Sequence, residues 1–194
     1  MRIIRFSQKD DAKGSSIELS FKSLGDLVDQ NDPSPYPSKE ITEVAEDAIA
    51  VHVGDLPVGR DVKLSINLPE KDVSPEVQEK LPDTIRQHFT IRASEIALER
   101  KREKLRIKRG LKLLAATIAF TFLTGGVIRV IPKSDMLSIP IVQLFVTGVL
   151  TILNWAALWN IYETYVMGDY RELGMKIRIY EKIARMQIRI TSGN

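Results

Sequence analysis

Two long uncharged apolar runs, at 113–128 and 136–162, dominate the hydrophobic pattern of the chain. The second run has twenty-seven residues, and a helix needs about 20 to cross the hydrocarbon core of a bilayer. The first run has sixteen, and it reaches the required length if the flanking Lys112 and Arg129 extend their side chains to the surface. The pattern therefore predicts a transmembrane helical hairpin over 113–162. Buried helices of a soluble protein are the alternative.

The residues before the hairpin show shorter patterns that are typical of a small mixed domain over 1–82. Residues 1–7 and 16–21 have strand composition, and 61–68 alternates regularly between polar and apolar positions. Short helices are expected at 23–30 and from Lys39, after a Ser38 cap. The positions expected to face the core of these helices are Leu24, Leu27 and Val28, then Ile41, Val44, Ala45, Ala48 and Ile49.

A long helix is expected to connect this domain to the hairpin. Ser74 and Pro75 are typical of a helix start, and Pro82 is expected to break or kink the helix. From Asp83 the helical pattern continues without Gly or Pro as far as Gly110. Residues 83–112 are therefore predicted to form a basic juxtamembrane helix that enters the bilayer.

The tail over 163–194 is expected to return to the same side of the membrane. An amphipathic helix is indicated by the spacing of Leu173, Ile177, Tyr180 and Ala184. The alternation over 186–190 is typical of a closing strand. The predicted fold class is thus α+β, a small cytoplasmic sheet-and-helix domain joined by a long helix to a two-helix transmembrane hairpin.

The distribution of charge predicts the orientation. Residues 1–91 carry a net charge of −6 and residues 92–194 a net charge of +9. Nine Lys and Arg residues lie between 92 and 112, and six follow the second span, whereas the turn holds only Arg129 and Lys133, offset by Asp135. Basic residues near the ends of spans favour the cytoplasmic side. We therefore expect a cell-membrane protein with both termini in the cytoplasm.

The basic residues before the first span are expected to bind anionic lipid headgroups, at about 1 kcal/mol for each side chain near the surface. We call them the basic collar: Arg100, Lys101, Arg102, Lys104, Arg106, Lys108, Arg109 and Lys112. Nucleic acid is not expected as a partner, because the run lacks aromatic side chains and adjoins a span.

Three polar or small residues of the second span are candidates for helix contact, namely Gln143, Asn154 and Gly148. Trp155, Trp159 and Tyr162 follow one another at helical spacing. They predict either an interfacial aromatic belt or a packing stripe against the first span.

No catalytic constellation is recognisable, and neither enzymatic activity nor a cofactor is expected. The chain has no cysteine and two histidines, His52 and His88, and neither has the spacing of a metal site. Asp32 precedes Pro33 and Ser34, which favours an Asx-type turn between two helices over a nucleophile.

Several stretches resemble a widespread prokaryotic family of two-span membrane proteins. Its Asp-Pro-Ser-Pro-aromatic motif corresponds to 32–36, and its His-Phe-x-x-Arg-Ala motif to 88–93. The resemblance covers about 18–190 and implies the architecture and membrane location, with no established activity and no catalytic residue. The chain departs from the family at 167–170, where a Trp-rich stretch is expected.

These observations favour an interaction or scaffolding subunit at the cytoplasmic face of the membrane. A homo-oligomeric channel or transporter component, with Gln143 and Asn154 facing a lumen, is the alternative, and an enzyme of a new kind ranks third. A homo-oligomer, most simply a two-fold dimer, is preferred to a monomer held by other subunits, with Phe89 and Ile96 in the interface. These two residues belong to a near-heptad stripe with Ile85 and Ala93.

Overall fold

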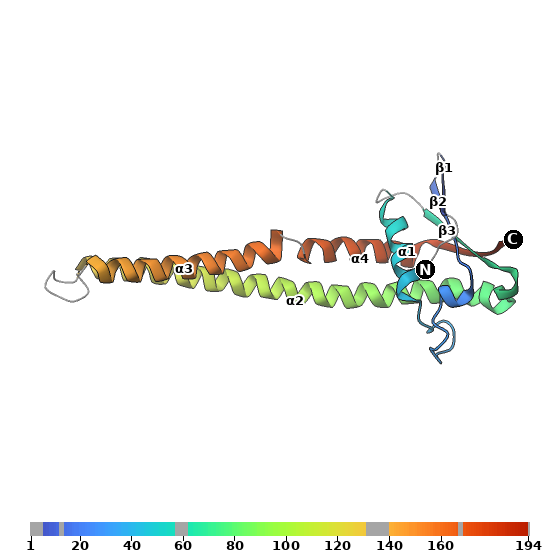
Figure 1. Cartoon of the computed structure of the whole chain (residues 1–194), viewed down its shortest axis with the longest axis horizontal. Coiled ribbons are helices and arrows are strands. Elements are labelled where there is room, and N and C mark those ends of the chain that lie inside the picture. Colours follow the sequence, from blue (N-terminus) through green and yellow to red (C-terminus); the bar gives the residue numbers. More distant parts are fainter. Residues whose placement is uncertain (1–5, 12–13, 57–61, 131–139, 167–168, 194) are drawn as a thin grey trace. The chain divides into compact units, whose positions relative to one another are not determined.

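A computed structural model describes residues 6–11, 14–56, 62–130, 140–166 and 169–193 (Figure 1). The first part of the strand expected at 1–7, the turn with Lys133 and Asp135, and the departure at Met167 and Gly168 lie outside these residues. The chain forms two compact units. The sheet unit comprises Met1–Ile96 and Met175–Asn194, and the helical unit comprises Ala97–Gly174.

The sheet unit is built on four strands in the order β1-β2-β3-β4. They are β1 (Phe6–Asp11), β2 (Gly14–Ser20), β3 (Val62–Pro69) and β4 (Gln187–Gly193). The first pair is antiparallel, whereas β2, β3 and β4 are parallel. Because β4 pairs with β3, the last twenty residues, 175–194, belong to the same compact unit as the N-terminal segment.

The predicted alternation of the third and fourth strands is confirmed. Every second residue of β3 is buried, and Ile188 and Ile190 of β4 are buried next to them. Phe89 and Ile183, from two different helices, complete this apolar core with 0 % exposure. Burial of one strand face against helices explains why the sequence alternates there.

The helix expected at 23–30 is wrong beyond a single 3-10 turn, η1 (Leu24–Asp26). A turn follows, and Val28 forms an isolated antiparallel bridge with Ile41. Leu27 and Val28 are nevertheless buried, as the apolar pattern predicted. The bridge to a distant segment satisfies backbone groups that a longer helix would have paired locally.

The next helix, α1 (Glu43–Gly54), begins four residues later than expected, and its N-cap is Thr42 rather than Ser38. The Thr42 side chain accepts a hydrogen bond from the amide of Ala45. The delay has a physical cause, since Glu40 and Thr42 form backbone hydrogen bonds with the segment at 27–29. The inward assignment of Val44 is also wrong, because this side chain is half exposed.

The long helix is confirmed as α2 (Pro75–Val130), fifty-six residues in one piece. Ser74 is its N-cap, accepting a hydrogen bond from the amide of Val77. Pro82 lies inside it, so the predicted break is wrong, whereas the alternative of a kink stays a prediction. Leu81 and Ile85 on either side are fully buried in the core, and their packing favours a continuous helix. A second 3-10 turn, η2 (Glu70–Asp72), precedes it.

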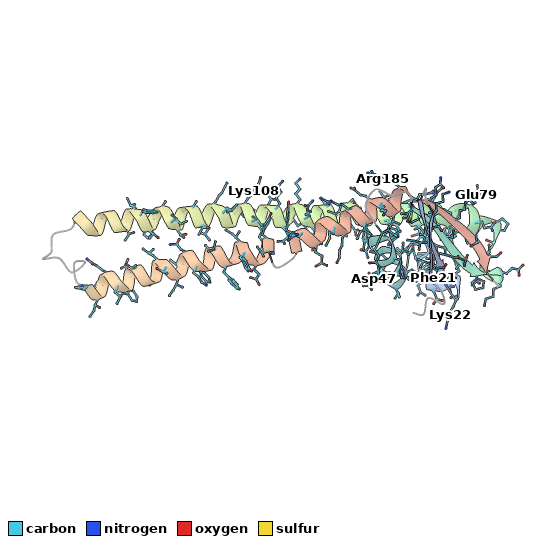
Figure 2. All side chains as sticks on the ribbon, turned by 90° about the horizontal axis from the view of Figure 1, so that it is seen from above. Phe21, Lys22, Asp47, Glu79, Lys108 and Arg185 are labelled. Carbon is cyan, nitrogen blue, oxygen red and sulfur yellow. The ribbon has the colours of Figure 1, made fainter. Side chains whose placement is uncertain are left out.

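The helical unit contains the later part of α2, the apolar helix α3 (Pro140–Val166) and the first residues of α4 (Asp169–Arg185). Within it, α2 and α3 run side by side (Figures 1 and 2). By length and composition, two helices in the described part of the chain, α2 and α3, are suited to cross a membrane. The predicted amphipathic helix at the C-terminal side is confirmed as α4.

Candidate functional site

The carboxylate of Glu46 on α1 lies within hydrogen-bond distance of three side chains of the sheet unit. His88 Nε2 lies 2.8 Å from Glu46 Oε2, and Arg92 Nε donates to the same oxygen at 3.1 Å. The Tyr180 hydroxyl donates to Glu46 Oε1 at 2.9 Å. Glu46 is only 6 % exposed. One carboxylate therefore joins three helices, α1, α2 and α4; we call these four residues the Glu46 cluster.

The helical spacing of the donors explains the geometry. His88 and Arg92 are four residues apart on α2 and so project from the same face. Phe89, between them, contacts the rings of both His88 and Tyr180 edge-on, with centroids 5.5 and 5.2 Å apart. The His-Phe-x-x-Arg-Ala motif thus supplies two of the donors to Glu46 and the aromatic ring that packs beside them.

The hydrogen bonds determine the ionisation of the cluster. Burial raises the pKa of Glu46, but the hydrogen bonds from His88, Tyr180 and Arg92 outweigh it and lower the pKa to about 2. The ionised carboxylate accepts only, so His88 Nε2 carries the donated proton. Burial, followed by the hydrogen bond to Glu46, raises the pKa of Tyr180. At neutral pH Glu46 is negatively charged, Arg92 is positively charged and Tyr180 is neutral.

This arrangement is suited to structure rather than to catalysis. A carboxylate with a pKa near 2 is a poor general base at neutral pH, and both of its oxygens are engaged. In the described part of the chain no group of three His, Asp or Glu side chains could hold a metal ion. The Glu46 cluster therefore fixes the packing of three helices.

The sequence did not reveal this cluster because the three partners of Glu46 lie at least 42 residues away along the chain. One signal was present: Glu46 lies between Ala45 and Ile49 on the apolar side of α1, where an acid requires a partner. The His88–Arg92 spacing on the other helix was a second signal. Neither signal could show that the apolar face of α1 and the His88–Arg92 face of α2 meet.

The Asx-type turn at Asp32 is confirmed. Its carboxylate accepts hydrogen bonds from the amides of Ser34, at 2.9 Å, and Glu40, at 2.7 Å. Hydrogen bonds from Ser34, aided by that from Glu40, lower the pKa of Asp32. The Asp-Pro-Ser-Pro-aromatic motif thus closes a loop between η1 and α1 and offers no activated nucleophile.

The basic collar is exposed along α2, with one exception. Lys101, Arg102, Lys104, Lys108, Arg109 and Lys112 all face solvent, as does Arg106, which also pairs with Glu103. Lys108 projects away from the helix axis (Figure 2). Arg100 differs, because its guanidinium lies 4.7 Å from the centre of the Tyr170 ring at the start of α4. Its role is helix contact within the helical unit.

The helix contacts in the helical unit agree only in part with expectation. Asn154 Nδ2 on α3 donates to Thr121 Oγ1 on α2 at 3.0 Å. Gly148, by contrast, has no atom within 4 Å of the position of a Cβ among the described residues, so no close approach depends on it. The close approach occurs instead at Gly110, where a Cβ would lie 3.0 Å from Ile161 Cγ1. Gln143 is half-buried on α3.

Burial bears on two further expectations. Trp155, Trp159 and Tyr162 form tilted ring contacts along α3 and are all exposed within the chain, which favours the interfacial belt over a packing stripe against α2. Phe89 is fully buried in the core of its own unit and Ile96 packs against that core. Phe89 is therefore a core residue within the single chain, and the interface role predicted for Phe89 and Ile96 stays a prediction.

Comparison with family models, with curated proteins and with solved structures gives no match to this chain.

Proposed function

We propose that the protein is a two-span membrane protein whose sheet unit lies in the cytoplasm and acts as an interaction or scaffolding subunit. The observation that carries the proposal is the continuity of α2. Residues at its start are buried in the sheet unit, its middle carries the basic collar, and its end is apolar. One helix thus links a folded domain to a segment that suits a bilayer.

The apolar surface of the helical unit supports a bilayer environment. Phe122 on α2 is 78 % exposed and Ile141 on α3 is 76 % exposed, and many other large aliphatic side chains of both helices are open. A contiguous apolar surface of this kind is unusual on a soluble monomer. Lipid chains would cover it without loss of hydrophobic free energy.

The orientation follows from the exposed cations. Seven of the eight residues of the basic collar are free to reach headgroups, and α4 adds further basic residues after the second apolar helix. The exposed Trp155, Trp159 and Tyr162 suit the interfacial layer near the same ends. Both termini would then be cytoplasmic.

An interaction role is supported by what the sheet unit offers. Its buried carboxylate is engaged by three donors that join helices, and the domain is small and continuous with α2. Such a domain suits the presentation of a surface to other proteins. The resemblance to the prokaryotic two-span family agrees with this architecture.

Reporter fusions test the topology. Fusions at Asn194 and in the Lys133–Asp135 turn are expected in opposite compartments, the first cytoplasmic and the second not. Both reporters in one compartment would exclude the hairpin.

Cross-linking in native membranes followed by mass spectrometry tests the role. One stable hetero-partner supports scaffolding, whereas self-adducts alone support the homo-oligomeric channel. The channel has less support, because Asn154, expected to face a lumen, donates its amide to Thr121 instead.

A further inference from the structure

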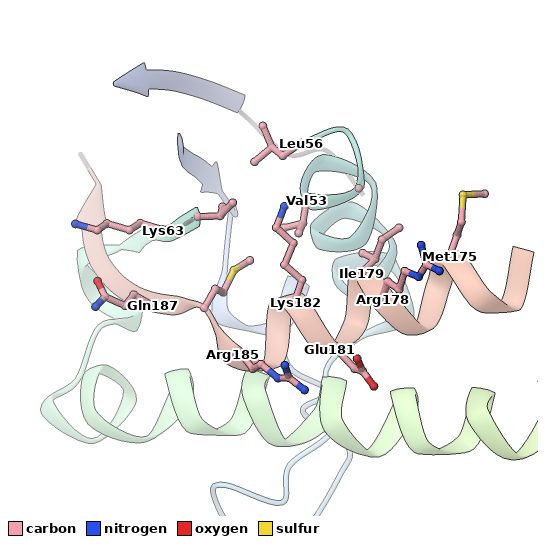
Figure 3. Close-up of a pocket in the computed structure, with 13 residues that line it drawn as sticks. Val53, Leu56, Lys63, Met175, Arg178, Ile179, Glu181, Lys182, Arg185 and Gln187 are labelled. Atoms are coloured by element: carbon pink, nitrogen blue, oxygen red, sulfur yellow. The ribbon is translucent and has the colours of Figure 1, made fainter. Parts of the chain in front are cut away.

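A groove of about 870 Å³ lies on the sheet unit, away from the Glu46 cluster. It is formed by the end of α1, the first residues of β3 and β4, and the second half of α4 (Figure 3). Its volume falls within the range of about 300–1,000 Å³ that is usual for ligand sites. No residue of the groove takes part in the Glu46 cluster.

The floor of the groove is apolar and recessed. Val53, Leu56, Val62 and Met186 line it and are each almost fully buried. Above them, Met175 is 62 % exposed and Ile179 is partly buried, and these two side chains supply the apolar surface that a partner can contact. The floor therefore fits an aliphatic side chain of a partner.

The rim of the groove is basic. Lys63 on β3 and Arg178, Lys182 and Arg185 on α4 line it, against one acid, Glu181. Lys63 and Arg178 stand at opposite sides with Lys182 between them (Figure 3). The described lining therefore carries more basic than acidic side chains, and the nearby C-termini of α1 and α4 each reduce this positive charge by about half a unit. Burial lowers the pKa of Lys182, which a bound anion would raise again.

The spacing of the cations defines the shape of the anion. Arg178 and Arg185 are seven residues apart on α4, which corresponds to about 10 Å along the helix. An anion with two separated charges can contact both without bringing the two side chains together. Carboxylates two to four residues apart on an extended peptide span about 7–13 Å and match this distance. The groove lining contains no aromatic side chain for stacking bases.

We propose that this groove binds a short, extended acidic segment of a partner protein, with one aliphatic side chain on the floor and carboxylates on the basic rim. The inference rests on the proposed interaction role and names the chemistry of the partner. Binding to the groove does not require the predicted membrane topology. The reporter fusions therefore test the topology and the binding experiment tests the groove, and either can fail without the other.

Peptide selection tests the proposal. The full chain in phosphatidylcholine nanodiscs is presented with a random heptapeptide library, and the selected sequences are expected to be rich in Asp and Glu around an aliphatic residue. The variant with Arg178→Glu and Arg185→Glu is expected to bind those peptides at least about tenfold more weakly and to select basic peptides instead. Selection without acidic enrichment, or unchanged selection by the variant, would overturn the proposal.

A matched control separates the groove from the total charge. Lys71→Glu with Arg189→Glu makes the same charge change at two exposed residues of the sheet unit outside the groove, and it should leave binding unchanged. Lys63→Glu changes the charge of the rim on a different element, β3. It is also expected to weaken binding, and it replaces the α4 variant in the test if that variant does not fold.

Two competing ligands test whether the groove binds a different class of anion. Displacement of the peptides by inorganic phosphate at equal concentration would indicate a small-anion site. Binding of dihexanoyl phosphatidylglycerol in the groove, without any selected peptide, would indicate a lipid site. Either result would overturn the assignment to an acidic protein segment.

Discussion

Glu46 and His88 are 42 residues apart in the chain, yet Glu46 Oε2 and His88 Nε2 lie 2.8 Å apart. The contact joins α1 to α2 at the depth of the apolar core, where Phe89 packs against both His88 and Tyr180. A buried charge is tolerated here because three donors compensate for its lost hydration. The same three donors make the carboxylate important for stability.

Glu46→Gln is expected to destabilise the sheet unit by about 2–3 kcal/mol, the usual value for lost hydrogen bonds to a charged group. The amide cannot accept from His88, Arg92 and Tyr180 as a carboxylate does. Hydrogen exchange of the β3 amides, measured by mass spectrometry in nanodiscs, should report the loss. Asp47→Asn, at the neighbouring exposed position of α1, is the control and should have little effect. Equal exchange in both variants would show that the cluster contributes no stability.

The stability of the sheet unit is expected to depend on pH through Glu46. Its pKa is lowered from 4.5 to about 2 in the folded chain, so the stabilisation is complete above the unfolded value. It is lost as the pH falls from about 4.5 towards 2, by about 3 kcal/mol in total. Urea unfolding followed by hydrogen exchange over this range should show the decline. The Glu46→Gln variant should show a correspondingly smaller dependence on pH.

Asn154 and Thr121 are expected to stabilise the helix pair in a bilayer. Interhelical hydrogen bonds in membranes contribute about 0.6 kcal/mol on average and up to about 2. A double-mutant cycle of Asn154→Leu and Thr121→Val, measured by reversible unfolding in bicelles, should give a coupling energy in this range. Thr151→Val serves as the control, since its hydroxyl donates to Thr147 within the same helix. A coupling energy of zero would assign the contact no role in pairing.

Neutralising the basic collar is expected to weaken contact with anionic lipid. Changing Arg102, Lys104, Arg106, Lys108 and Arg109 to Gln removes five exposed cations, each worth about 1 kcal/mol near such a surface. Electron paramagnetic resonance of spin-labelled phosphatidylglycerol around the protein in mixed vesicles should show fewer immobilised lipids. Arg100→Gln should have a smaller effect on lipid, because Arg100 contacts Tyr170. Tight binding of RNA by the unchanged protein at physiological salt would contradict the lipid assignment.

Local patterns in the sequence were sufficient for several elements. The alternation in β3, the Ser74–Pro75 start of α2 and the apolar spacing of α4 each follow from a rule that acts over a few residues. Burial of one face imposes these periods directly on the sequence. The two apolar helices are likewise evident from length and composition.

Elements that depend on a distant partner could not be predicted in this way. Residues 23–30 have helical spacing, but Val28 pairs with Ile41 and the helix ends after one 3-10 turn. The start of α1 moves to Glu43 for the same reason. Pro82 remains inside α2 because the core holds Leu81 and Ile85 on both sides of it.

The sequence by itself determined which residues are apolar, how the strands alternate and where the cations are concentrated, because each of these is a local property. Only the tertiary structure decided that Glu46 receives His88, Arg92 and Tyr180, that Phe89 belongs to the core, and that Gly110 rather than Gly148 approaches another helix. These contacts join elements from separate parts of the chain. Their geometry depends on how whole faces pack, which no spacing within one element specifies.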